Sequence, residues 1–249
     1  MASTPVSSNK RKATDETTSQ RKVRRLFSEA PKTGTRMVAV HVGKGTSMKS
    51  FEVYEELLIR HSEFFRAAVS KKWREGQERA VSLPEDKPGH FEIFFNFLNG
   101  GQIFSSKEGD HDPEQNTDLE WSRLIWCWIL GQKLLSVTFK DAILDAIVAK
   151  MQDQGRYSKA LYMQPFDYST PSQSLRKLLS DIVVYKWVPL DWTYNTPDIA
   201  KYPEHLLDVA MALDAVKWQG RDASPPWANN DCTYHEHVAD GTPCYKTLF

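Results

Sequence analysis

The fold is decided by residues 38–53, VAVHVGKGTSMKSFEV. From Val38 to Val42 every second residue is a valine, which is the period of a strand that buries one face. The stretch Gly43–Gly45 supplies a turn, and Phe51 and Val53 continue the alternation in a partner strand. We therefore predict a β-hairpin whose valines face a core.

After the hairpin the apolar spacing becomes helical. Residues 55–60 predict a short helix, and Ser62 is suited to cap the N-terminus of a second one. A short strand is expected from Ala80 to Leu83, and a further helix that follows it ends at Gly100-Gly101. The predicted buried faces of the second and third helices are Phe64, Phe65, Ala68 and Val69, and Phe91, Phe94, Phe95 and Leu98.

The second half of the chain is predicted to be mostly helical. Residues 121–135 are apolar nearly all round, so their helix has to be central. Thr138 and Asp141 resemble a capping pair for the next helix. Residues 105–118 are polar and show no period, and we expect them to form an exposed, mobile loop.

Together these periods predict an α+β fold, in which a small sheet is packed on a helical cluster. The expected regions are a disordered basic arm (1–35), a core domain (36–152), a helical extension (153–220) with helices near 173–187 and 203–217, and a loose C-terminal tail (221–249). The arm is expected to be disordered because it has too few apolar residues to offset the entropy of ordering.

Charge is divided unevenly along the 249 residues. Residues 1–36 hold nine Lys/Arg and three Asp/Glu, whereas the remainder holds 23 and 29, so a basic arm precedes an acidic body. An acidic body argues against a folded surface that neutralises nucleic-acid phosphates. No stretch is apolar enough for a membrane span, and three scattered cysteines do not suggest a disulfide framework. We expect a nuclear or cytoplasmic protein with reduced thiols.

Several segments occur in the order in which BTB/POZ domains place theirs. Val38–Gly43 resembles the first strand of that family, and Phe51–Leu58 resembles its second strand and the entry to its first helix. His61-Ser-Glu-Phe-Phe65 is similar to its "S-x-F-F" helix start, and Val81-Ser-Leu-Pro-Glu-Asp86 to its "L-x-x-D" strand. The resemblance covers about residues 36–152. It implies a BTB/POZ fold and a non-enzymatic protein–protein interaction module for homo- or hetero-oligomerisation.

The chain departs from many members of the family at one place. These members have an acidic residue ahead of the first strand and a His-Lys or His-Arg pair after the second, which shape a corepressor pocket. Here Met37 and Tyr54-Glu55 occupy those positions, so the resemblance does not extend to such a pocket. The whole chain looks most like the fungal BTB proteins that carry no kelch, MATH or zinc-finger partner domain.

A tryptophan stands where cullin-binding BTB adaptors have a hydrophobic-x-Glu motif. The match is Trp73-Arg74-Glu75. It implies a substrate adaptor for a cullin-based ubiquitin ligase, with the partner-binding residues Phe64, Phe65, Trp73 and Glu75. An exposed tryptophan is a good interface anchor because it buries a large area at a small loss of rotamer entropy. Alternatively, Trp73 closes the core beneath its helix.

The C-terminal tail holds four side chains of the types that bind zinc. They are Cys232, His235, His237 and Cys244, and they include two of the three cysteines of the chain. Zinc prefers tetrahedral nitrogen and sulfur donors, so we predict a structural Zn site here, with an unliganded tail as the alternative. Cys127, inside an apolar helix, is expected to be a packed small hydrophobe.

Two basic clusters in the arm have the layout of a bipartite nuclear localisation signal. They consist of Lys10 and Arg11, and of Lys22, Arg24 and Arg25. The alternative is an ordinary solvated basic tail. If the signal operates, the chain could instead be a nuclear transcriptional co-regulator that tethers transcription regulators through its BTB surface. Nucleic acid would then be bound at most weakly by the arm.

We find no sequence signature of catalysis. Gly43-Lys-Gly-Thr46 lacks the earlier glycine of a phosphate-binding loop and lies in a hairpin, so we interpret it as a turn. No nucleophile elbow, HExxH motif or paired-carboxylate pattern occurs. These features favour a protein that is not an enzyme.

Overall fold

The computed structural model describes residues 34–70, 78–112, 117–154, 160–186, 201–219, 224–229 and 232–249. The strands are β1 (Met37–Val42), β2 (Lys49–Tyr54), β3 (Ala80–Leu83), β4 (His111–Asp112) and β5 (Thr117–Asp118). The α-helices are α1 (Glu55–His61), α2 (Glu63–Ala68), α4 (Pro88–Gly100), α5 (Leu119–Lys133), α6 (Val137–Gln154), α7 (Ala160–Tyr168), α8 (Gln173–Tyr185), α11 (Pro203–Gln219) and α12 (His237–Asp240). Short 3-10 turns cover Gly45–Ser47, Pro226–Asn229 and Tyr245–Thr247.

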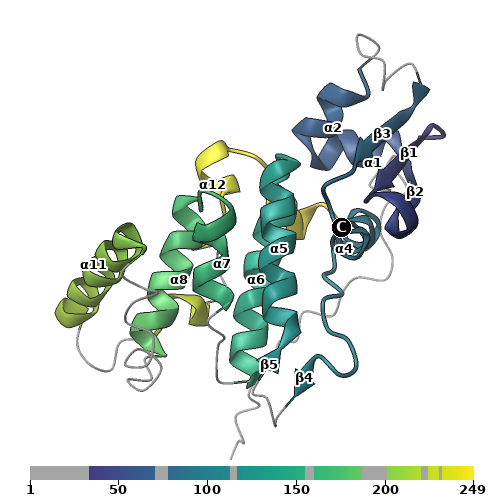
Figure 1. Cartoon of the computed structure of the whole chain (residues 1–249). Coiled ribbons are helices and arrows are strands. Elements are labelled where there is room, and N and C mark those ends of the chain that lie inside the picture. The colour runs from purple at the N-terminus through teal and green to yellow at the C-terminus, as the bar shows by residue number, and fades with distance from the viewer. Residues whose placement is uncertain are drawn as a thin grey trace, which may run out of the picture. The chain divides into compact units, whose positions relative to one another are not determined.

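The main sheet has three strands in the order β2-β1-β3 (Figure 1). β1 and β2 form the predicted antiparallel hairpin, in which Val40 faces Phe51 across the ladder. β3 pairs with β1 in parallel, so the chain has to cross over, and α1 and α2 lie in that crossover. The valines of β1 are buried, whereas alternate residues of β2 are exposed, so the core lies on one face of this mixed sheet. The small sheet and the many helices confirm the predicted α+β class.

The tryptophan-rich helix α5 is central, as predicted. Trp121 and Trp128 are fully buried, and α5 packs along α6 and against α4 (Figure 1). The Phe94 ring of α4 meets the Phe139 ring of α6 edge-on, with ring centroids 5.0 Å apart. One aromatic core therefore connects the helices on both sides of α5. Cys127 on α5 is fully buried, as predicted for a packed small hydrophobe.

Ser62 fixes the start of α2 by two hydrogen bonds. Its hydroxyl accepts from the backbone N–H of Phe65 at 3.1 Å and donates to the carbonyl of Leu134 at 2.6 Å. The first contact is the predicted N-cap. The second ties α2 to the turn between α5 and α6, so one side chain both starts a helix and places it.

Residues 106–109 are exposed, as predicted for a loop, but Ser105 and Asp110 on either side of them are buried. Asp110 is buried and forms a two-pronged ion pair with Arg123 of α5, at 2.6 Å for each N–O contact. The Ser105 side chain is also buried, and its hydroxyl donates to Glu120 at 2.6 Å. A bidentate pair of low exposure is stronger than an ordinary surface ion pair. It holds this segment against α5.

The helical extension contains one unexpected helix. In α8 the predicted face of Leu175, Leu178, Leu179 and Ile182 is buried. α7 forms where no helix was predicted, although Pro165 lies inside it. A proline removes a single backbone donor, and the buried Leu161 packs α7 into the core. The described residues contain no helix long and apolar enough to cross a membrane.

The C-terminal segment is packed, so the expected loose tail is wrong for residues 224–229 and 232–249. Trp227 and Tyr234 belong to the buried core. The Phe249 ring stacks on His61 at 5.2 Å between centroids and meets Phe97 edge-on at 5.3 Å. Residues Thr33–Phe249 thus form one compact unit. The irregular spacing of these aromatic anchors leaves no period by which the sequence could have revealed them.

A substitution at Gly101 can test how closely the C-terminal segment packs against α4. It ends α4 with φ of +68°, and a Cβ there would lie 2.4 Å from the Phe249 ring. Gly101→Ala should therefore lower the free energy of unfolding by about 2 kcal/mol or more, since left-handed strain and overpacking add. Gly100→Ala is the control, because nothing lies within 4 Å of its Cβ position. Urea titration measures both, and equal stability of the two variants would contradict this packing.

Candidate metal centre

The four predicted zinc-type ligands come together in the C-terminal segment. Cys232 begins a turn that is closed by the His235 N–H donating to the Cys232 carbonyl at 3.0 Å. His237 opens the short helix α12, and Gly241 at φ +67° ends it, so that the chain turns back to Cys244. Cys232, His235, His237 and Cys244 each offer one donor atom, and these atoms lie within 4.8 Å of one another.

The measured separations match a tetrahedral site. The Sγ atoms of Cys232 and Cys244 are 3.9 Å apart, and the Cys244 Sγ is 3.8 Å from the His235 Nδ1. Metal bonds of about 2.3 Å to sulfur and about 2.0–2.1 Å to nitrogen give tetrahedral edges of about 3.8 Å (S–S) and about 3.6 Å (S–N). The donors are therefore spaced as if around a single ion.

A carboxylate on α6 orients the first imidazole. The Nδ1 of His237 lies 2.8 Å from the Oδ2 of Asp141, whose side chain is fully buried. With Nδ1–H donating to this carboxylate, the lone pair of Nε2 is left for a metal. Asp141 also accepts from the backbone N–H of Glu236 at 2.7 Å. Burial raises the pKa of Asp141, and these hydrogen bonds oppose the rise.

A second carboxylate, one helical turn further on, orients the other imidazole. The Nε2 of His235 lies 3.0 Å from the Oδ1 of Asp145, so that its Nδ1 faces Cys244. Asp145 also accepts from the Tyr245 hydroxyl at 2.6 Å and from Lys246 at 2.9 Å. Burial alone would raise the pKa of Asp145, but these hydrogen bonds outweigh it and hold the pKa below its usual value.

Electrostatics favour a cation between the two sulfurs. Both histidines are buried, whereas both cysteines are half-buried. Burial, and then the neighbouring Cys244, raise the pKa of the Cys232 thiol. Two thiolates side by side repel each other, and a bound cation removes that repulsion and deprotonates coordinating thiols. The arrangement is therefore chemically suited to a metal ion, because Asp145 and Asp141 are placed to accept a proton from one ring nitrogen of each histidine and leave the other for the metal.

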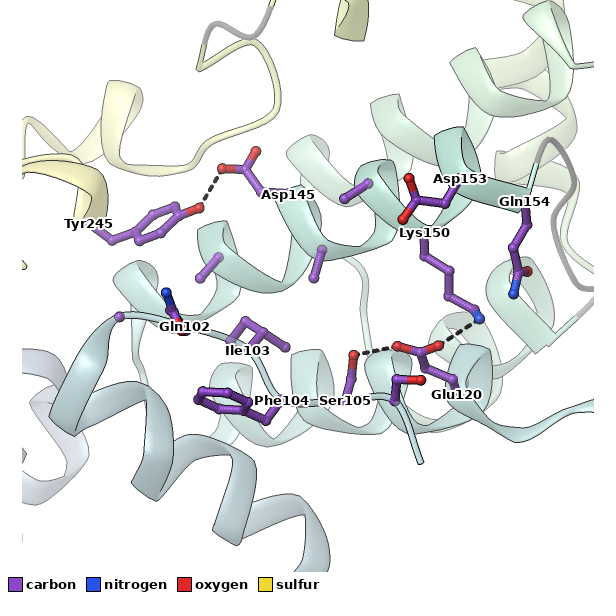
Figure 2. A pocket seen from close by; sticks show the side chains of 15 residues that line it. Gln102, Ile103, Phe104, Ser105, Glu120, Asp145, Lys150, Asp153, Gln154 and Tyr245 are labelled. Atoms are coloured by element: carbon purple, nitrogen blue, oxygen red, sulfur yellow. Dashed lines mark hydrogen bonds and ion pairs between the residues drawn. The ribbon is translucent and has the colours of Figure 1, made fainter. Parts of the chain in front are cut away.

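A groove of about 650 Å³ runs along α6 next to the metal cluster, and Asp145, which contacts His235, lines it (Figure 2). Asp145 and Tyr245 line one part of it, and Glu120 and Lys150 another, with the segment 102–105 along the side (Figure 2). Lys150 pairs with Glu120 at 2.7 Å and with Asp118 at 2.8 Å. Asp145 and Lys150, in different parts of the groove, thus already have ion-pair partners. Tyr245 of the C-terminal segment helps to line the groove.

The other predicted site residues are not gathered at this centre. Phe65 is fully buried, so it cannot contact a partner in this structure and is corrected to a core residue. Phe64 is half-buried and lines a cleft of about 660 Å³ between α2 and β3. Trp73 and Glu75 lie outside the described residues. So do the arm residues Lys10, Arg11, Lys22, Arg24 and Arg25.

The two carboxylates that hold the histidines were not predicted from the sequence. Asp141 was expected to cap a helix together with Thr138, whereas Thr138 contacts the His61 ring at 3.0 Å and Asp141 binds the C-terminal segment. A signal was present, since Asp141 and Asp145 stand at i, i+4 on a helix most of whose other buried residues are apolar. Acidic residues on a buried helical face need partners.

Comparison with known proteins supplies no relative. No family model matches the chain, and no curated protein matches it.

The carboxylate–histidine contacts predict a graded loss of metal binding. Asp145→Asn removes the charge that holds His235, so the affinity for Zn²⁺ should fall about 10–100-fold. The matched control is Asp153→Asn, because Asp153 lies two turns further along α6 and is exposed. Competition with a chromogenic chelator measures both. Equal affinities for Asp145→Asn and the unaltered protein would show that the contact does not support a metal.

Proposed function

We propose that this chain is a BTB/POZ-type protein–protein interaction module that catalyses no reaction. The observation that carries the proposal is the order of elements within one body. A hairpin, two helices, a strand, then α4, α5 and α6 follow one another in the order that the BTB/POZ resemblance implies. The hairpin and the short strand β3 also belong to one sheet, which supports a small sheet packed on helices.

Three histidines are poorly suited to act as general bases near neutral pH. Burial lowers the pKa values of His61, His90 and His205 to about 4 in each case. A general base works best with a pKa near the operating pH. His61 is instead engaged in packing, between Thr138 and the stacked ring of Phe249.

The module would bind a second copy of itself or a cullin-like scaffold, in the latter case as a ubiquitin-ligase adaptor. The cleft between α2 and β3 supports the adaptor form, because Phe64, Ala67 and Ala68 give it an apolar wall and the exposed Leu135 lines it too. α2, which contributes to this cleft, ends at Ala68, five residues before Trp73 in the sequence. Apolar and aromatic anchors of this kind dominate interface energies.

Pull-down with a cullin N-terminal domain tests the adaptor form. Trp73→Ala should weaken capture at least tenfold, the loss expected when an interface anchor is removed. Leu207→Ala is the control, since Leu207 is exposed on the distant element α11. Capture that is unchanged by Trp73→Ala contradicts the adaptor form. Light scattering of the full chain then decides whether the module pairs with itself.

We further propose that the metal cluster binds one structural Zn²⁺. Two thiolates and two imidazoles at tetrahedral spacing are the donors that zinc prefers, and four protein ligands leave no open position for chemistry. The ion would fasten the C-terminal segment to α6, because both histidines already contact that helix. Its role is to complete the body that carries the interaction surfaces.

Metal content tests the zinc proposal. The purified chain should contain one zinc per molecule, Cys232→Ser should lose it, and Cys127→Ser should keep it because Cys127 is buried in α5. Free zinc at about 1,000 times its Kd adds ~4 kcal/mol to stability, which corresponds to a rise in Tm of roughly 8–16 °C. Zinc-free protein whose Tm is insensitive to added zinc would refute the proposal.

The nuclear co-regulator remains the alternative function. It rests on the two basic clusters of the arm, at Lys10-Arg11 and Lys22–Arg25. A co-regulator and an adaptor would use the same interaction body, so they differ in location and partner and not in fold.

A further inference from the structure

The two cysteines of the metal cluster are arranged for a reaction with each other. Their Sγ atoms are 3.9 Å apart, and both side chains are half-exposed while the two histidines beside them are buried. An oxidant in solution can therefore reach the sulfurs more easily than the nitrogens. The remaining cysteine, Cys127, is fully buried in α5, and burial raises the pKa of its thiol to about 12.

We propose that the Cys232–Cys244 pair is a peroxide-sensitive switch: oxidation of zinc-bound thiolates to a disulfide expels the zinc and loosens the C-terminal segment from α6. This inference rests on the zinc site proposed above and concerns its regulation. Zinc-bound cysteines are thiolates, which are the reactive form toward peroxide. Two of them in contact allow the first oxidised sulfur to be attacked by the second.

The reaction balances with hydrogen peroxide as oxidant. One thiolate attacks a peroxide oxygen, the O–O bond breaks, and a sulfenic acid and hydroxide form. The second thiolate then attacks the sulfenic sulfur, so that the S–S bond forms and a second hydroxide leaves. Two protons from solvent convert the hydroxides to water. The sulfurs lose two electrons and the peroxide gains them, and zinc departs as Zn²⁺.

The geometry connects this reaction to the fold. Disulfide formation shortens the S–S separation from 3.9 Å to about 2.05 Å, so Cys244 or Cys232 has to move. Tyr245 follows Cys244 directly, and its hydroxyl bond to Asp145 is 2.6 Å long. Phe249 lies four residues beyond, stacked on His61. Loss of the ion also removes the common partner of His235 and His237, whose hydrogen bonds to Asp145 and Asp141 do not depend on it.

The test uses the full zinc-loaded chain with hydrogen peroxide and a chromogenic zinc chelator. We expect one zinc to be released per molecule, a mass 2 Da below that of the reduced chain, and a peptide map that joins Cys232 to Cys244. Dithiothreitol with added zinc should restore the starting state. Retained zinc, a disulfide that involves Cys127, or a mass gain from sulfinic acid overturns the switch.

Two variants distinguish disulfide formation between Cys232 and Cys244 from non-specific oxidation of the chain. Cys232→His keeps four nitrogen and sulfur ligands but cannot form the disulfide, so peroxide should release its zinc at least tenfold more slowly. Cys127→Ser should behave as the unaltered chain. Equal release from Cys232→His and the unaltered chain overturns the proposal. If Cys232→His binds no zinc, the disulfide map of the unaltered chain decides.

Hydrogen exchange tests the structural consequence. Backbone amides in 232–249 should exchange at least tenfold faster after oxidation, while those in the core of α5 should not change. Unchanged exchange in 232–249 overturns the loosening of the segment. A reduced chain whose Tm does not respond to added zinc disproves the zinc site itself, whereas a zinc-loaded chain that resists peroxide disproves only the switch.

Discussion

A carboxylate sealed from water constrains much of this structure. Asp141 is fully buried on α6, and an ionised carboxylate without partners in such a place costs several kcal/mol. Its partners are the backbone N–H of Glu236 and the imidazole of His237, which come from the far end of the chain. The C-terminal segment therefore has to lie against α6. That placement in turn brings Cys232 and Cys244 together and seats Tyr245 and Phe249 against the aromatic core.

Much of the fold could be predicted from the spacing of apolar residues, because this spacing is regular in the central elements. The alternating valines of β1 and the all-round apolar character of α5 identify a hairpin and a buried helix directly. The spacing of apolar residues gives no information about contacts between residues that lie far apart in the sequence. Nothing local in residues 105–112 reveals that Asp110 forms an ion pair with Arg123, and nothing in β3 reveals that it runs parallel to β1. α7 was not predicted, because Pro165 and the tyrosines around it are a composition typical of a connecting segment.

The candidate site divides in a similar way. Its ligands could be predicted from residue type and closeness in sequence, since Cys and His within thirteen positions are a recognisable donor set. The groups that orient them could not, because Asp141 and Asp145 are about ninety positions away and their roles depend on tertiary contact. Local sequence also does not distinguish a core residue from an interface residue. Phe64 and Phe65 are adjacent and of the same type, yet Phe65 is buried in the core and Phe64 lines a cleft.

The ninety-six positions between Asp141 and His237 have a consequence for synthesis on the ribosome. At about 5–20 residues per second, α6 is made roughly 5–20 s before the imidazole that it needs. During that interval the carboxylate has to stay hydrated, and α6 cannot settle into its final surroundings. The nascent chain should therefore pass through a stage in which the hairpin and α5 have formed a compact core while one side of α6 stays hydrated and accessible to chaperones.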